Sequence, residues 1–406
     1  MKHVIIGSGA AGISAAKTLR DGSSQDEIVI LSSDEFVYSR CMLHQFISGE
    51  REKAALSFVD DDFFLENQIT LKLNTTVTKI DNANRTVHFA GGSESYDRLL
   101  IATGSKSYFP AIDGLSDTKN VYGLRNISDA KAICDKAKNA KNIVIIGAGL
   151  GGMDAADGLL KMDKNPTVVE LSETILSTSL DARAARIYQE KFEEAGCVFR
   201  LGSKVSGVLS DTDGFVTAVT LENDEQISCD LLIVAAGVRP ATDVTEGSGI
   251  VSERGIKVDI FMATGQGDVF AAGDVTGLSE TWPSATLQGE LAAMGMLGLK
   301  TLEVDKFLPK TTIHFFGIPS LSVGIINAQQ GDEENCREDR NRYQKVVLSN
   351  GIPVGVLLQG DISRAGFWQQ LIDQKVDVSA MPKSVWKVSF ADSYHIDENG
   401  EYHWKI

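Results

Sequence analysis

The same glycine pattern occurs twice in this 406-residue sequence, and it constrains the fold more than any other feature. The first copy, HVIIGSGAAGISAAKTL, is an apolar strand followed by Gly7, Gly9 and Gly12 and then by a helix rich in alanine. A second apolar segment, EIVILSSD, ends at Asp34, 22 residues after Gly12. Such glycines allow a tight turn, close approach of a pyrophosphate and close packing of helix on strand, while an acid at this distance accepts hydrogen bonds from ribose. The pattern predicts a dinucleotide site with the pyrophosphate at the helix N-terminus.

The second copy is KNIVIIGAGLGGMDAADGL, with Gly147, Gly149 and Gly152, and its following strand ends at Glu170. Two such units in one chain imply two dinucleotides and therefore electron transfer between them. The stretch after Glu170 contains no Lys or Arg before Arg183. A 2′-phosphate would be repelled by Glu170 and would find no nearby cation. The second site is therefore predicted to prefer NAD(H) over NADP(H).

Three further buried strands end in residues suited to contact a ligand. YDRLLIATGS ends at Thr103 and Gly104, CDLLIVAAGVRP at Gly237, and ATGQGDVFAAGDVT at Asp274. Asp274 could accept hydrogen bonds from a polyhydroxyl chain, and it could also act as the N-cap of a following helix. Beyond about Lys306 the composition changes and indicates a sheet with one helix, in which SNG is a hairpin signal.

Composition excludes several classes of function. A net charge of −16 makes nucleic acid a poor partner, because phosphate binding needs a cationic face. No two of the five cysteines lie within four residues, so no local pair for zinc or an iron–sulfur cluster is present. The sequence enters a strand almost at once and holds no apolar run near the ~20 residues of a membrane span. We expect a cytoplasmic protein with reduced thiols.

The paired glycine motifs, with LLIATG, GVRP and FAAGDV in this order, resemble the FAD- and NAD(P)H-dependent pyridine nucleotide–disulfide oxidoreductase superfamily. The resemblance implies an α/β fold with two Rossmann-like, three-layer ββα domains and an α+β C-terminal interface domain. It implies an FAD-binding domain formed by residues 1–112 and 243–305, an NAD-binding domain at 113–242 and an interface domain at 306–406.

The resemblance also assigns binding residues for FAD and for NAD(H). The residues expected to contact FAD are Gly7, Gly9, Ala11, Gly12, Asp34, Arg40, Val77, Thr103, Gly104, Asp274 and Trp282. The residues expected to contact NAD(H) are Gly147, Gly149, Leu150, Gly152, Asp154, Glu170 and Gly237. No metal site is expected.

The segment YSRCMLHQFISGE distinguishes the branches of the superfamily. Disulfide reductases need a second sulfur within reach, and here the segment holds only Cys41. Single-cysteine members such as coenzyme A-disulfide reductase align with Cys41 and FISGE, but Met42 replaces their glycine and Ala10 their glycine-loop histidine. Tyr38, Arg40 and the LRNISDA stretch resemble rubredoxin reductase and the FAD region of NADH-dependent nitrite reductase instead. Ferredoxin reductases of oxygenases carry a Lys where this chain has Gln45.

The resemblance implies an FAD-dependent NADH oxidoreductase that exchanges electrons with a rubredoxin-type or iron–sulfur protein. One alternative is the NAD-reducing flavin subunit of a larger redox complex, and another is a single-cysteine CoA-disulfide or polysulfide reductase that uses Cys41 as a redox residue. The resemblance to the rubredoxin and nitrite reductases favours a packing role for Cys41. A homodimer and a complex subunit both remain open.

Overall fold

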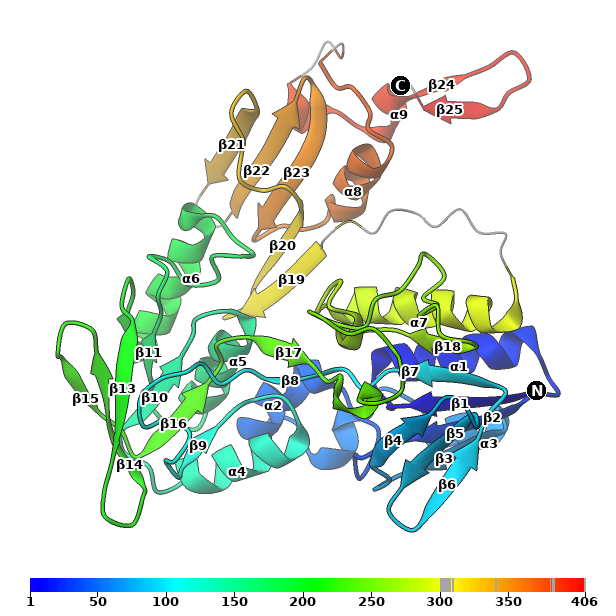
Figure 1. Ribbon diagram of the computed structural model, residues 1–406. Helices are drawn as coiled ribbons and strands as arrows, with labels where there is room; N and C mark the ends of the chain where they lie inside the picture. The colour runs from blue at the N-terminus through cyan, green and yellow to red at the C-terminus, as the bar shows by residue number, and fades with distance from the viewer. Residues whose placement is uncertain (300–307, 309, 340–341, 380, 382–383, 405–406) are drawn as a thin grey trace. The chain divides into compact units, whose positions relative to one another are not determined.

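The computed structural model describes residues 1–299, 308, 310–339, 342–379, 381 and 384–404 (Figure 1). The chain separates into two compact units, which are described in turn. The first comprises Met1–Gly147, Asp154–Thr167 and Val205–Asp305, and the second comprises Ala148–Met153, Val168–Lys204 and Lys306–Ile406. The domain boundaries expected from the sequence stay a prediction.

The first unit is built on a five-stranded parallel sheet. Its order is β18 (Val269–Ala271), β7 (Arg98–Ile101), β1 (Lys2–Ile6), β2 (Glu27–Leu31) and β3 (Ile69–Lys72). A parallel sheet covered on both faces needs strands that are apolar on both sides. The central strands KHVII and RLLI meet this condition and are almost wholly buried.

Different layers cover the two faces of this sheet. Helices α1 (Ala10–Gly22) and α7 (Trp282–Leu297) lie side by side and pack their alanines and leucines into one hydrophobic cluster with the sheet (Figure 1). The antiparallel strands β4 (Val77–Asp81), β5 (Thr86–Phe89) and β6 (Gly92–Ser95) form a second cluster with the opposite face. This arrangement confirms the expected three-layer ββα architecture.

A second parallel set in the first unit contains β10 (Ile143–Ile146), β16 (Leu231–Val234) and β9 (Val121–Tyr122). Three antiparallel strands form a meander, as β4, β5 and β6 do. They are β13 (Val205–Ser210), β14 (Val216–Leu221) and β15 (Gln226–Ser228). Helix α4 (Ile127–Ala137) begins at a capping box formed by Asn126 and Asp129. Strands β8 (Ser105–Ser107) and β17 (Val238–Pro240) pair as a short antiparallel ribbon.

Short helical turns connect the longer elements of the first unit, and one of them, η1, contains Cys41. They are η1 (Arg40–Met42), α2 (Leu43–Ile47), η2 (Lys53–Leu56), α3 (Phe63–Glu66), η3 (Asp243–Thr245) and η4 (Asp274–Thr276). Helix α5 (Leu150–Leu160) follows the second glycine loop, and β11 (Thr167–Val169) follows that helix.

The second unit contains a five-stranded antiparallel sheet. Its order is β19 (Lys310–Phe315), β20 (Ile318–Gly324), β23 (Ile352–Gln359), β22 (Arg342–Ser349) and β21 (Glu333–Asp339). Asn350 and Gly351 both have positive φ and join β22 to β23, which confirms the hairpin predicted at SNG. The sequence EENCRED reads as a charged loop around Cys336, but the structure places Cys336 in strand β21, paired with Lys345 of β22.

Helices pack against this sheet. Helix α8 (Ala365–Asp373) buries Phe367, Trp368 and Leu371 in the core of the second unit. Helix α6 (Ala182–Glu194) inserts Tyr188, whose hydroxyl donates to the carbonyl of Ile318 at 2.6 Å. The other elements of this unit are β12 (Val198–Arg200), η5 (Val385–Lys387), α9 (Phe390–Ser393), β24 (Tyr394–Ile396) and β25 (Tyr402–Trp404). In the described part of the chain, none of the helices has the length and apolar character needed to cross a membrane.

Candidate cofactor cavity and its electron-transfer site

A cavity of about 420 Å³ opens where the strands of the first parallel sheet end. In sheets of this type, ligands bind beyond the carboxyl ends of the strands, and the turns after β1, β2, β7 and β18 all line this cavity. Ten of the eleven residues expected to contact FAD line it: Gly7, Gly9, Ala11, Asp34, Arg40, Val77, Thr103, Gly104, Asp274 and Trp282. These residues belong to loops that are far apart in the sequence, and the strand order of the sheet brings those loops to one edge.

The eleventh residue, Gly12, supports the loop from behind. A Cβ atom at Gly12 would lie 2.0 Å from the carbonyl oxygen of Gly7, so only glycine fits there. Gly7 has φ +111°, and its Cβ would lie 2.2 Å from the carbonyl oxygen of Ala102. A Cβ at Gly9 would meet no atom within 4 Å, because this position faces open space. The loop therefore offers a bare backbone and the N-terminus of α1 to a ligand, which fits the pyrophosphate of a dinucleotide.

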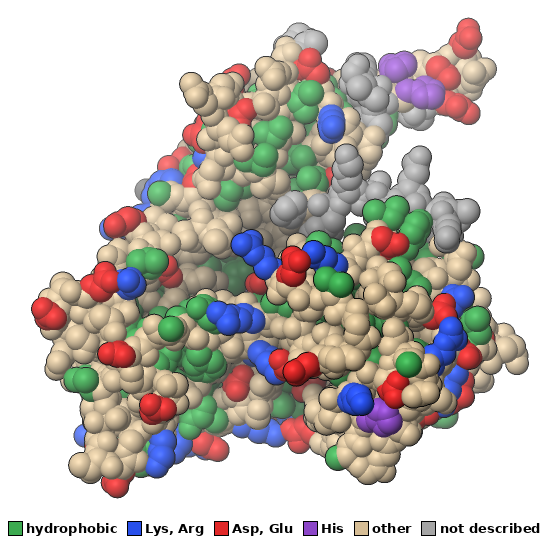
Figure 2. All heavy atoms as spheres, in the orientation of Figure 1, with side chains coloured by type: hydrophobic (Ala, Val, Ile, Leu, Met, Phe, Trp, Pro, Cys, Tyr) green, Lys and Arg blue, Asp and Glu red, His purple; other side chains and the backbone are tan. Residues whose placement is uncertain are grey.

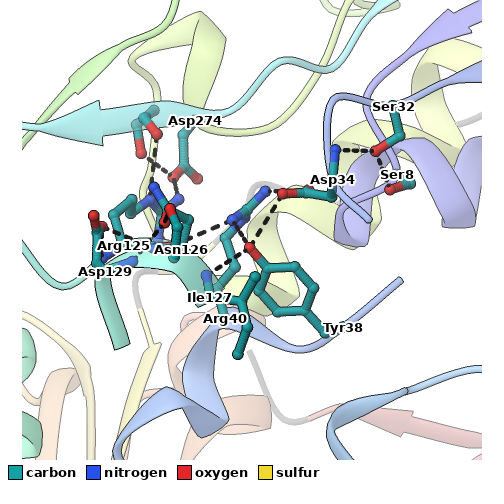
Figure 3. A network of polar contacts seen from close by, with 12 residues as sticks. Ser8, Ser32, Asp34, Tyr38, Arg40, Arg125, Asn126, Ile127, Asp129 and Asp274 are labelled. Carbon is teal, nitrogen blue, oxygen red and sulfur yellow. Dashed lines mark hydrogen bonds and ion pairs between the residues drawn. The ribbon is translucent and has the colours of Figure 1, made fainter. Parts of the chain in front are cut away.

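Asp34 sits in a polar cluster at the end of β2 (Figure 3). Its carboxylate pairs with the Arg40 guanidinium at 2.7 Å and accepts from the Tyr38 hydroxyl at 3.2 Å. The Tyr38 oxygen in turn accepts from Arg40 at 2.6 Å and from the backbone N–H of Ile127 at 3.0 Å. Burial raises the pKa of Tyr38 to about 12, so its hydroxyl remains a donor at neutral pH. The cluster holds the carboxylate where the ribose of a dinucleotide would be expected.

Asp274 forms the second polar cluster of the cavity (Figure 3). Its carboxylate accepts from the Ser105 hydroxyl at 2.7 Å and pairs with Arg125. The Arg125 carbonyl accepts from Arg40 at 3.3 Å, which joins the two clusters. The backbone N–H of Arg125 donates to Asp129 at 2.9 Å and so fixes the start of α4. Arg125 and Ser105 were not expected in the site, although the LRNISDA stretch contains Arg125.

A buried amide fixes the turn that carries Asp274. Gly273 has φ +83°, and its N–H donates to Oε1 of Gln288 on α7 at 2.9 Å. The hydroxyl of Thr276 donates to the same oxygen, also at 2.9 Å. The expected further role of Asp274 as N-cap of the helix that follows is wrong, because Asp274 is the first residue of η4, whose N-cap is Gly273, and the N-cap of α7 is Thr281.

A second cavity of about 800 Å³ adjoins the first and shares Asp34, Arg40, Thr103 and Arg125 with it. Lys106 lines both cavities, and the wall of the second cavity adds Lys131, Asp129 and Glu35. Lys131 and Lys53 both pair with Glu35 and hold the pKa of that carboxyl below its usual range. The first cavity therefore continues into a second one through shared residues, and side chains of both charges line the second cavity.

Cys41 lines the first cavity at the start of η1. Its surface reaches solvent, yet the surrounding protein partly desolvates the thiol and the carboxylate of Asp154 adds negative charge nearby. Both effects raise the pKa of Cys41. A redox cysteine works as a thiolate, so this environment favours the packing role expected from the sequence.

Next to Cys41, His44 of helix α2 lies close to Asp154 of helix α5, which places an imidazole beside a carboxyl group. The Nδ1 atom of His44 is buried without a hydrogen-bond partner and lies 3.8 Å from Oδ1 of Asp154. Burial raises the pKa of Asp154 to about 7, and the charge of Asp157 adds to the effect. The helices approach this closely because Gly158 faces the His44 carbonyl, where a Cβ would lie only 2.8 Å away. Gln45 accepts a hydrogen bond from Arg51.

The residues expected to contact NAD(H) fall in both units. In the first unit, Gly147 follows β10 with φ +103°, Gly237 follows β16 with φ +106°, and Asp154 lies on α5. In the second unit lie Gly149, Leu150, Gly152 and Glu170. There, one carboxylate oxygen of Glu170 accepts from the N–H of Ala148 at 2.6 Å and the other from the N–H of Ser172 at 2.8 Å.

Comparison with known proteins assigns this architecture to a family. Residues 1–289 match the pyridine nucleotide-disulphide oxidoreductases, and residues 309–376 match the rubredoxin NAD+ reductase C-terminal domain. The chain is 32% identical to the NADH-dependent phenylglyoxylate dehydrogenase subunit epsilon of Aromatoleum evansii over 94% of this chain and 93% of that protein. It is 29% identical to the nitrite reductase [NAD(P)H] of Bacillus subtilis over 94% of this chain, but it spans only 48% of that protein. It is 28% identical to a rubredoxin-NAD(+) reductase of Pseudomonas putida over 74% of this chain and 81% of that protein.

Solved structures show the same fold. The NADH:rubredoxin oxidoreductase from Clostridium acetobutylicum superposes with a TM-score of 0.76 at 24% identity, covering 94% of this chain and 97% of that one. A chain of the covalent putidaredoxin reductase–putidaredoxin complex superposes with a TM-score of 0.81 at 23% identity, covering 93% and 94%. The chain belongs to the pyridine nucleotide-disulphide oxidoreductase family and is an FAD-dependent NAD(P)H oxidoreductase.

Proposed function

We propose that this protein transfers electrons between NAD(H) and a small one-electron redox protein of the rubredoxin or iron–sulfur type. The observation that carries the proposal is the single thiol of the cofactor cavity. Among the described residues that line the cavity, Cys41 is the one cysteine, and its surroundings disfavour the thiolate. A dithiol exchange therefore lacks both its partner and its nucleophile, and electrons would pass to the acceptor without a protein disulfide.

The names of the relatives agree with this proposal. They include rubredoxin-NAD(+) reductases and the ferredoxin--NAD(+) reductase component of a 3-phenylpropionate/cinnamic acid dioxygenase from Photorhabdus laumondii, to which the chain is 30% identical over 73% of its length. The match of residues 309–376 to the C-terminal domain of rubredoxin reductase points to the same branch.

The residues that line the cavity fit FAD in their chemistry. When bound, FAD supplies the ability to take up two electrons together and to return them one at a time. The loop of Gly7 and Gly9 would hold the pyrophosphate, Asp34 the ribose and Asp274 the polyhydroxyl chain, with Trp282 beside the ring system. Arg40 pairs with Asp34 and Arg125 pairs with Asp274, and these ion pairs hold the two carboxylates in place.

We further propose that NAD(H) binds through the second glycine loop, with Glu170 accepting hydrogen bonds from the adenosine ribose. The two N–H groups that hold Glu170 fix its carboxylate beside the loop in the second unit. The FAD domain would then comprise residues 1–112 and 243–305, with the NAD domain at 113–242. The five cysteines are free thiols, which supports a cytoplasmic location.

A second candidate is the NAD-reducing flavin subunit of a larger oxidoreductase, with electrons entering from a partner subunit. The full-length match to the phenylglyoxylate dehydrogenase subunit epsilon favours it, because that relative is named as one subunit of an NADH-dependent enzyme. Both candidates need the same cavity and differ in the direction of electron flow and in the partner.

The experiment that tests the proposal compares Cys41→Ser with the control Cys134→Ser, whose half-buried thiol lies on α4 outside the cavity. We expect both variants to reduce a one-electron dye and a rubredoxin or ferredoxin with NADH as fast as the wild-type protein. Anaerobic titration with NADH should consume only the two electrons that one FAD accepts. Loss of protein reduction in Cys41→Ser alone, or uptake of four electrons by the wild-type protein, would establish the single-cysteine reductase instead.

Affinity purification from the native cell separates the two candidates. A co-purifying small rubredoxin or ferredoxin supports the first, and a stable complex with larger catalytic subunits supports the second. Rapid reduction of the flavin by NADH with no transfer to any one-electron protein acceptor would contradict both.

A further inference from the structure

We propose that the C-terminal hairpin β24–β25 is a binding site for one divalent first-row transition metal ion of the Zn²⁺ type. The site is independent of the cofactor cavity and of the proposed electron-transfer function. Its ligands would be the imidazoles of His395 and His403 and the carboxylates of Asp397 and Glu401.

The antiparallel register of the hairpin places the two histidines together. His395 of β24 is the direct cross-strand partner of His403 of β25. Directly opposed residues share one face of an antiparallel pair, and their side chains lie within contact distance. The two imidazole rings accordingly have their centroids 5.6 Å apart and are inclined by 33°. Figure 2 shows histidine side chains beside acidic ones on this hairpin.

The two acids occupy the next positions on the same face. Side chains alternate along a strand, so residues two positions from each histidine project to the same side. Asp397 follows His395 by two residues, and Glu401 precedes His403 by two. One ligand atom each of Asp397, Glu401 and His403 all lie within 4.8 Å of one another. The pattern H-x-D-x-x-x-E-x-H therefore gathers one imidazole and two carboxylates at a single turn, with the His395 ring beside that of His403.

The local geometry suits a metal ion. Oδ2 of Asp397 lies 3.1 Å from Nε2 of His403. Two ligand atoms that are each about 2.0–2.1 Å from one metal ion are themselves about 3.0–3.4 Å apart. The other oxygen of Asp397 accepts from the N–H groups of Asn399 and Glu401, both at 2.9 Å, which fixes the carboxylate orientation. This backbone support plays the role that outer hydrogen bonds play for metal-binding carboxylates.

The choice of ion follows from the donor set. Imidazole favours Zn²⁺ and its neighbours in the first transition row over Mg²⁺ and Ca²⁺, which prefer oxygen ligands alone. The side chains of His403 and Asp397 are 46% and 27% exposed, so an ion can reach them from solvent. An isolated two-stranded hairpin is marginally stable in water, and a bound ion would lock its two strands together.

The test titrates the full-length, FAD-loaded protein with Zn²⁺ after treatment with a chelator. It follows the ion with a competing chromophoric chelator and the hairpin by limited proteolysis. We expect one Zn²⁺ per chain and slower cleavage within residues 384–404 when it is bound. His395→Ala, His403→Ala and Glu401→Gln should each weaken binding by about tenfold or more, comparable to or above the effect of losing an outer contact. NADH oxidation should be unchanged in all three.

Two variants serve as matched controls. His314→Ala removes an exposed histidine of β19, and Glu398→Gln removes an exposed acid of the same hairpin turn that lies outside the cluster. Both should bind Zn²⁺ like the wild-type protein. Substitution by Co²⁺ should give a spectrum of nitrogen and oxygen ligation without a thiolate charge-transfer band. The proposal is overturned by the absence of saturable binding, by wild-type binding in His403→Ala and Glu401→Gln, or by a thiolate band that places the ion on cysteine.

Discussion

The acid beside Cys41 offers the sharpest test of the electrostatics of the site. Asp154 is 31% exposed, yet its pKa rises from 3.8 to about 7 because the protein desolvates its carboxylate and Asp157 repels it. A carboxyl whose pKa is raised on folding contributes stability in full below pH 3.8, and this contribution is lost as the pH rises through about 7. Replacing Asp154 with Asn removes the charge at every pH. The variant should therefore gain stability relative to the wild-type protein as the pH rises.

The size of the effect follows from the shift. A change of about three pKa units corresponds to roughly 4 kcal/mol at about 1.4 kcal/mol per unit. The carboxylate retains some contact with water, which screens the interaction and reduces this value by about half. At pH 5 the carboxyl of residue 154 is already ionised in the unfolded chain, so the wild-type protein has already lost part of this free energy at that pH. Between pH 5 and pH 8 we expect Asp154→Asn to gain roughly 1–2 kcal/mol relative to the wild-type protein.

The assay compares urea unfolding of both proteins at several pH values, with the FAD concentration held constant because bound ligand adds to apparent stability. Asp135→Asn is the control, since Asp135 is 73% exposed, pairs with Lys138 on the surface and has a lowered pKa. The pH dependence of its difference from the wild-type protein should be flat over this range. Alkylation of Cys41 gives a second readout, because removing the Asp154 charge lowers the pKa of the thiol and speeds the reaction at a given pH. A stability difference for Asp154→Asn that is the same at pH 5 and pH 8 would refute the reasoning.

Three further predictions concern the glycine loop and the ion pairs of Asp26 and Lys345. Gly7→Ala would place a Cβ 2.2 Å from the carbonyl oxygen of Ala102, so the purified variant should lack flavin absorbance, and normal FAD content would contradict the geometry. Burial alone would raise the pKa of Asp26, but hydrogen bonds from the N-terminal amine and His3 lower it to about 2, so its contribution is present above about pH 4 and lost as the pH falls toward 2. Asp26→Asn should therefore cost roughly 1–2 kcal/mol at pH 7 and little at pH 2 in urea unfolding, and an equal cost at both would be inconsistent with this account. Lys345 is 7% exposed and pairs with two carboxylates, so Lys345→Ala should cost about 3 kcal/mol of unfolding free energy, whereas a change within about 0.5 kcal/mol would show that the pairs contribute little.

Much of the cofactor cavity could be predicted from the sequence because its signals are local. The glycines are dictated by backbone conformation and by contacts with adjacent strands, as at Gly7 and Gly12. Asp34 and Asp274 follow buried strands, and parallel strands bring their carboxyl ends to one edge of a sheet. The hairpin at SNG could also be predicted, since Asn350 and Gly351 tolerate the positive φ that they adopt.

The contacts between residues that are far apart in the sequence could not be predicted from local sequence signals. Arg125 pairs with Asp274 across 149 residues of sequence, and the Ile127 N–H reaches the Tyr38 hydroxyl across 89. Ser105 carries no local signal that distinguishes it from a surface residue, and the LRNISDA stretch that contains Arg125 does not indicate the contact of Arg125 with Asp274. The charged loop expected around Cys336 is a strand because pairing with β22 outweighs the low strand propensity of its charged residues.

The sequence by itself determined the two dinucleotide-binding folds, the turn that presents each carboxylate and the absence of a cysteine pair, because these depend on residue type and short-range geometry. Tertiary structure alone decided the charge state of the site. The thiol of Cys41 and the carboxyl of Asp154 both have raised pKa values because the protein around them excludes water and places further acids nearby. Desolvation and Coulomb interactions act through space, and only the packing of α2 against α5 sets those distances.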